Sequence, residues 1–155
     1  MNRMSLSKGV FFGFCVFFVS TFLFADVGRV AEISSIEGPA WFRKGGTTEW
    51  KGAEKGMLLL ESDEIKTGEN AKVEILLDTA GETGKLDLAA NTQMRFETMK
   101  KDPTTEDKTT LLDLAVGKVL IKAEELKKNS SFRVKTPTSI CGVRGTLFEV
   151  QVETK

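Results

Sequence analysis

Few residues of this 155-residue chain could do chemistry. The sequence contains no histidine, which excludes the Ser-His-Asp and Cys-His mechanisms and every histidine-ligated metal site. The densest acidic cluster, Glu61, Asp63 and Glu64, falls around a turn, where we expect solvated carboxylates rather than a catalytic acid–base pair. The acidic residues between positions 78 and 87 lack the regular spacing of a calcium-binding loop. We therefore predict no enzyme, no metal site and no cofactor.

Cys141 is the one residue with latent reactivity. If the apolar N-terminus is removed, it is the single remaining cysteine, so no disulfide can form within the domain. Only Arg144 and Lys135 lie close enough in the sequence to activate it. Two interpretations stay open. One is a small buried thiol, because cysteine prefers protein interiors; the other is a disulfide-linked dimer formed through Cys141 in an oxidising compartment.

Charge and aromatic content argue against two classes of ligand. Lysine plus arginine and aspartate plus glutamate both total 22, whereas nucleic-acid-binding domains concentrate positive charge. We therefore expect no nucleic acid as a partner. Beyond residue 26 the rings are two tryptophans and four phenylalanines, with no tyrosine. Trp41 and Trp50 bracket the Gly45-Gly46 turn, which predicts a cross-strand pair rather than a platform for sugars.

The elements that must position these residues begin with an export signal. A basic head, with Arg3 and Lys8, precedes an apolar run from Gly9 to Ala25. As a helix this run would span about 25 Å, short of the roughly 30 Å hydrocarbon core of a bilayer. We expect residues 1–25 to be a signal helix that is cleaved before Asp26, with an uncleaved membrane anchor as the alternative. The expected location is the periplasm or another part of the cell envelope.

Residues 26–155 predict a single all-β domain. Apolar side chains alternate over residues 71–78, where Val73, Ile75 and Leu77 share one face. Shorter alternations follow at 86–88, 94–96, 112–114, 119–121, 132–134 and 147–152. Gly and Pro turns separate the segments, which favours a compact sandwich or a short β-helical stack. We expect short helical turns at most at 53–60 and 123–128, and an exposed loop over 98–110.

The segment from Thr136 to Val150, TPTSICGVRGTLFEV, resembles the hallmark of the FecR domain family, roughly T-P-x-a-x-x-G-V-R-G-T-x-F-x-V. The residues that carry the resemblance are Thr136, Pro137, Gly142, Val143, Arg144, Gly145, Thr146 and Phe148. Weaker matches extend it over residues 28–152: Gly38, Gly56, Leu58, Asp63, Ile65, Thr67, Gly68 and Gly117 to Val119. The resemblance implies an all-β module on the outer side of the bacterial inner membrane.

Two roles for the motif stay open. Arg144 has five donors in a fixed fork, so it could tie together carbonyls or a carboxylate within the domain. It could instead face a carboxylate of a partner protein. Gly142 and Gly145 would permit a bulge or a close backbone approach, and Thr136-Pro137 an extended entry into the last strand. Cys141 stands where the family tends to have a small residue such as alanine.

The function that the resemblance implies is protein interaction or signal sensing in the cell envelope. In the member that names the family, the domain senses a loaded transporter and relays the signal to a sigma factor through a cytoplasmic segment. Only eight residues precede the apolar run here, so we expect a stand-alone module that binds another envelope protein. Because relatives continue beyond the matching point, we expect a shortened fold or one completed by a partner's strand.

The alternative is an exported β domain that binds or hydrolyses cell-wall carbohydrate. Such a domain needs exposed aromatic rings or a pair of carboxylates in a cleft, and the sequence offers neither pattern clearly. In either case we expect contact with a membrane only through residues 1–25, if they are retained.

Overall fold

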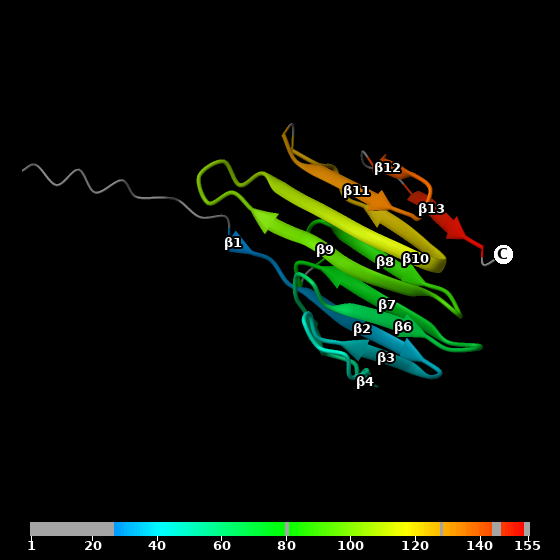
Figure 1. Ribbon diagram of the computed structural model, residues 1–155. Helices are drawn as coiled ribbons and strands as arrows, with labels where there is room; N and C mark the ends of the chain where they lie inside the picture. The colour runs from blue at the N-terminus through cyan, green and yellow to red at the C-terminus, as the bar shows by residue number, and fades with distance from the viewer. Residues whose placement is uncertain (1–26, 80, 128, 144–146, 154–155) are drawn as a thin grey trace, which may run out of the picture.

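A computed structural model of the chain describes residues 27–79, 81–127, 129–143 and 147–153 (Figure 1). All regular structure in these residues is β-strand, which confirms the predicted all-β class. The predicted signal helix and its cleavage point lie outside the described residues. Within the described ranges, no helix is long and apolar enough to span a membrane.

Thirteen strands make up the fold, and several are short. In chain order they are β1 (Val27–Gly28), β2 (Ala31–Glu37), β3 (Ala40–Arg43), β4 (Lys51–Gly52), β5 (Leu58–Leu59), β6 (Glu64–Thr67), β7 (Lys72–Leu77), β8 (Gly84–Leu88), β9 (Gln93–Lys101), β10 (Lys108–Ala123), β11 (Ser131–Lys135), β12 (Ile140–Val143) and β13 (Leu147–Val152).

The strands join into one curled sheet whose central member is β10. Its first part pairs with β9 and β11, and its second part with β8 and β13 (Figure 1). We call the first half sheet A, which holds β1, β3, β4, β6, β9, β11, β12 and the start of β10. We call the other half sheet B, which holds β2, β5, β7, β8, β13 and the end of β10. All pairs are antiparallel except β10 with β11, which is parallel.

Successive runs of the chain cross from one half to the other along a single crease. The runs β2–β3, β6–β7, β8–β9 and β10 each give one part to sheet A and one to sheet B. Hydrogen bonds connect the crossing points: Gly68 N donates to Pro39 O at 2.8 Å, and Asn91 N donates to Gly68 O at 3.1 Å. At the next crossing Lys118 N donates to Thr92 Oγ1 at 3.0 Å. Hydrogen bonds therefore link successive crossing points along the crease.

One hydrophobic core lies between the two halves. Period-two alternation puts every second side chain on the inner face, so Val73, Ile75 and Leu77 are fully buried as predicted. The core also takes Met94 and Phe96 from sheet A, and it forms a single cluster. The predicted sandwich or stack is thus a sheet folded over its own crease, because β10 serves both halves.

Two local predictions are wrong. The two short alternations at 112–114 and 119–121 belong to one strand, β10, which bends at the crease. The predicted loop over 98–110 is largely the β9–β10 hairpin, in which Met99 and Thr110 are buried. The sequence allowed short helical turns at most at 53–60 and 123–128, and none forms among the described residues there, which agrees with the all-β class. The polar side chains of residues 98–110 led to the prediction of a loop, because the outer face of a paired strand can be entirely polar.

Candidate functional site

An open groove of about 700 Å³ lies at the C-terminal end, between the β11–β12 hairpin and β13. Strands β11 and β13 lie at different positions along β10, so the two halves separate there. Phe148, Val150 and Val152 line one wall, and all three lie on the core-facing side of β13. Cys141 and the turn at 136–139 line the other wall. The core of the domain is therefore partly open at this end.

The Thr136-Pro137 part of the sequence motif builds the lip of this groove. Thr136 N donates to Ser139 O at 2.8 Å, and Ser139 N donates to Thr136 Oγ1 at 3.1 Å. These bonds close a tight turn in which Thr136 is buried while Pro137 and Thr138 are exposed. The turn reverses the chain between β11 and β12. The motif thus positions an exposed turn across the groove from the apolar side chains of β13.

Two further motif residues, Gly142 and Val143, have different surroundings. Val143 is buried and lies across from Phe132 in the neighbouring strand. A Cβ at Gly142 would have no heavy atom within 4 Å, so close packing of the described residues does not explain this glycine. Arg144, Gly145 and Thr146 lie outside the described residues, so both interpretations of Arg144 stay predictions.

Cys141 is neither fully buried nor fully exposed, so its position does not decide between a buried thiol and a disulfide-linked dimer. It pairs with Val134 across β11 and β12, on the inward side, but its side chain is only partly buried. Its Sγ lies 4.0 Å from Ser139 Oγ. The thiol faces the groove, where it is less enclosed than a core residue.

The arginine that ties elements together within the described fold is Arg29, which the sequence analysis did not single out. Its Nε and one terminal nitrogen bind both carboxylate oxygens of Asp78 at 2.6 and 2.8 Å. The same side chain donates to Thr110 at 2.9 Å and Thr83 at 2.8 Å. These partners lie 49 to 81 residues away in the sequence, so no local spacing indicates them.

Asp78 is a structural acid rather than a reactive one. Burial alone would raise its pKa, but hydrogen bonds from Arg29, Lys108 and Thr83 outweigh burial and lower the pKa to about 2. The carboxylate stays ionised at neutral pH and accepts hydrogen bonds from Arg29, Lys108 and Thr83. A general acid needs a raised pKa, so Asp78 does not suit that role.

The prediction that Glu61, Asp63 and Glu64 are solvated carboxylates is wrong for Asp63. Asp63 is buried, and it accepts from the backbone N–H groups of Gly45 and Leu60, both at 2.9 Å. Glu61 accepts from the backbone N–H of Met99 at 3.0 Å. These carboxylates hold loops in place. No cluster of three or more metal-ligating side chains occurs within the described ranges.

The tryptophans lie on the outer face of sheet A and are covered by cations. Lys66 Nζ lies 4.4 Å from the centre of the Trp50 ring and 5.3 Å from that of Trp41. The guanidinium of Arg43 lies 4.7 Å from the Trp50 ring. The rings are partly buried and already have these partners, so they do not form an empty stacking platform.

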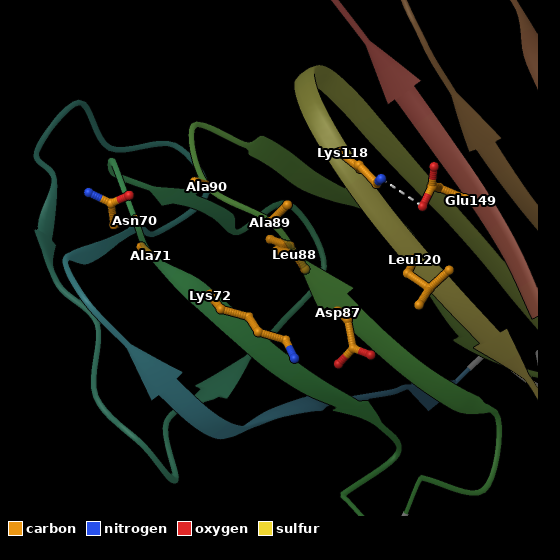
Figure 2. Close-up of a pocket in the computed structure, with 10 residues that line it drawn as sticks. All are labelled: Asn70, Ala71, Lys72, Asp87, Leu88, Ala89, Ala90, Lys118, Leu120 and Glu149. Carbon is orange, nitrogen blue, oxygen red and sulfur yellow. Dashed lines mark ion pairs between the residues drawn. The ribbon is translucent and has the colours of Figure 1, made fainter.

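A second, smaller hollow of about 430 Å³ lies on the outer face of sheet B (Figure 2). Its floor includes Leu120, and the side chains of Lys72 and Asp87 stand over it. Lys118 and Glu149 close one end with an ion pair of 2.9 Å (Figure 2). The lining is mainly apolar, and its charged groups include the Lys118–Glu149 pair. Among the described residues, the buried Oδ1 of Asp87 accepts no hydrogen bond, although Lys85 Nζ lies 3.6 Å from it.

Comparison with known proteins gives one finding. The family model described as FecR protein matches residues 63–155, which include β10 and both walls of the open groove. No curated protein matches the chain, and no solved structure does.

Proposed function

Because the chain belongs to the FecR protein family, we propose that it is a non-catalytic module of the bacterial cell envelope that binds another protein. The open groove between β12 and β13 is the binding site, and through it the module senses a signal. The observation that carries this proposal is the position of the groove, within the matched residues and beside the Thr136-Pro137 turn. The proposed location is the periplasm or another part of the envelope, reached through a leader at residues 1–25.

The chemistry of the groove suits a peptide or protein surface. The wall formed by β13 offers the apolar side chains of Phe148, Val150 and Val152, while the turn at 136–139 supplies polar groups on the other wall, a mixture found in protein interfaces. Two strands, β12 and β13, border it, and each pairs with one neighbour among the described residues. Their other edges are suited to pairing with an extended segment.

The carbohydrate alternative has less support. Lys66 and Arg43 cover the tryptophan rings that would stack on sugars. Asp63 is buried and Asp78 is partly buried, and structural hydrogen bonds occupy both carboxylates, which do not pair with each other across a cleft. Saturable binding of the purified protein to peptidoglycan would favour this alternative over protein binding.

A photo-crosslinking amino acid at Thr138 tests the proposal in living cells. Thr138 is exposed and lines the groove, so we expect a crosslinked protein product that mass spectrometry can identify. The matched control is the same amino acid at Lys55, which is exposed but lies in the β4–β5 connection. Equal products from both positions, or none from Thr138, would contradict the proposal.

The identified partner should then be purified and its binding measured directly. Phe148→Ser removes apolar surface from the groove wall, so we expect binding at least about tenfold weaker. A circular-dichroism spectrum of the variant shows whether the fold is kept. The N-terminal peptide recovered from the same cells tests whether residues 1–25 have been removed.

A further inference from the structure

Strand β13 is the longest sheet edge that lacks a described partner on one side. It runs for six residues and pairs only with β10 among the residues that the structure describes. The edge strands β4 and β5 have two residues each, and β12 has four. Proteins commonly protect sheet edges by making them short. An edge as long as β13 is therefore a place where another strand can pair.

The strand that fits this edge must continue the inner apolar face. Val150 is 7% exposed, whereas Phe148 and Val152 are only partly buried and line the groove. A strand added beside β13 would cover them if its own apolar side chains alternate on the same face. Its outer face must be compatible with Glu149, which lies on the opposite side of β13.

Strand β13 meets this requirement itself. In an antiparallel pair with Val150 opposite Val150 of a second copy, Phe148 faces Val152 and Glu149 faces Gln151. A shift of two residues in one direction puts Glu149 opposite Glu149, and in the other direction opposite Glu153. A shift of one residue puts apolar side chains against the polar face. Among the registers within two residues of it, only the one centred on Val150 avoids both penalties.

We propose that a second copy of this chain binds at this edge, through antiparallel β13–β13 pairing centred on Val150. The two copies of sheet B then form one continuous sheet, and each copy covers the groove wall of the other. The inference rests on the proposed function, because it names the partner for the same open end. The interface is isologous, so each contact occurs twice.

Charge changes at Gln151 test the proposal in solution. The register puts Gln151 opposite Glu149 of the second copy, so Gln151→Glu creates two like-charge contacts and Gln151→Lys two ion pairs. Sedimentation equilibrium of protein produced from the full-length chain should show a dimer. We expect its dissociation constant to rise about tenfold with Gln151→Glu and to fall with Gln151→Lys. The same two changes at Thr47, exposed in the β3–β4 connection, should leave it unchanged.

Cysteine pairing tests the register directly. In a Cys141→Ser background, one sample carries Glu149→Cys and another carries Gln151→Cys. The register brings residue 149 opposite residue 151 of the other copy, so a disulfide-linked dimer should form when the two samples are mixed and oxidised. Each sample alone should stay free of disulfide. Equal crosslinking in the separate samples would overturn the register.

The remaining outcomes separate the inference from the proposed function. A wild-type protein that is monomeric at every concentration, while Thr138 captures a different protein in cells, overturns the second copy and keeps the proposed function. A monomer with no product from Thr138 overturns both. A dimer that disappears with Cys141→Ser also overturns the inference, since the disulfide would then hold the copies together.

Discussion

Arg29 makes four side-chain hydrogen bonds of 2.6–2.9 Å and is 7% exposed. Through them it connects the start of the described chain to Asp78, at the end of β7, and to Thr110 in β10. A buried charge is tolerated where all its donors are satisfied, because an unsatisfied charged group costs several times more than a neutral one. The residue therefore has a structural role, which its sequence position alone does not indicate.

Replacing Arg29 should lower the free energy of unfolding. Arg29→Met leaves Asp78 with Lys108 and Thr83 but removes the bidentate partner, so we expect the free energy of unfolding to fall by about 2–3 kcal/mol. Urea denaturation measures the loss. The control is Arg43→Met, which breaks a more exposed ion pair and should cost about 1 kcal/mol or less. Similar losses from both variants would contradict the structural role of Arg29.

The pKa of Asp78 predicts an acid-dependent loss of stability. Its folded pKa is about 2, below the ordinary value of 3.8, so its contribution is present above pH 3.8. That contribution, about 2 kcal/mol, is lost as the pH falls toward 2. Denaturation at a series of pH values should show a weaker acid dependence in Asp78→Asn than in the wild type. Parallel curves of stability against pH for the two proteins would show that Asp78 does not cause the acid-dependent loss.

At the scale of the elements, the crease depends on backbone geometry at Gly117. Its φ is +97°, and a Cβ there would lie 2.4 Å from Cα and Oγ1 of Thr92. An L side chain avoids this φ, and the neighbouring backbone leaves no room. The bend of β10 therefore requires glycine, and with it the connection of sheet A to sheet B.

Gly117→Ala should destabilise the fold by at least about 1–3 kcal/mol, because strain and steric overlap add. Thermal or urea unfolding measures the change. Gly52→Ala is the matched control, since Gly52 also lies in a strand but has open space where a Cβ would lie. If Gly117→Ala is as stable as Gly52→Ala, the crease does not require its glycine.

At the scale of the whole molecule, one strand and one core join the two halves. Strand β10 pairs with β9 and β11 in sheet A and with β8 and β13 in sheet B, so neither half keeps its centre if the other unfolds. The buried residues of both halves form a single cluster. Cooperative unfolding of small domains follows from such shared contacts.

Urea unfolding should therefore show one transition for both halves. Both tryptophans, Trp41 and Trp50, belong to the sheet A side, so their fluorescence reports on that half. Far-ultraviolet circular dichroism reports on the strands of both. We expect the two midpoints to coincide. A fluorescence midpoint at a clearly different urea concentration would show that the halves unfold separately.

The sequence by itself determined the all-β class, the buried face of β7 and the family. Alternation of apolar residues is a local property, and it fixes which side chains face inward before any partner is known. The TPTSICGVRGTLFEV segment supplied the family in the same local way, and the match over residues 63–155 confirms it.

Only the tertiary structure decided which distant residues meet. It brought Arg29 to Asp78 and Thr110, turned the polar 98–110 stretch into a hairpin, and made β10 one strand shared by both halves. It also opened the groove between β12 and β13. These features depend on register and on how a curled sheet closes. The 98–110 hairpin is a local pairing hidden by its polar side chains. For Arg29, β10 and the groove, pairing between segments far apart in the chain sets the arrangement, and local spacing carries no information about that pairing.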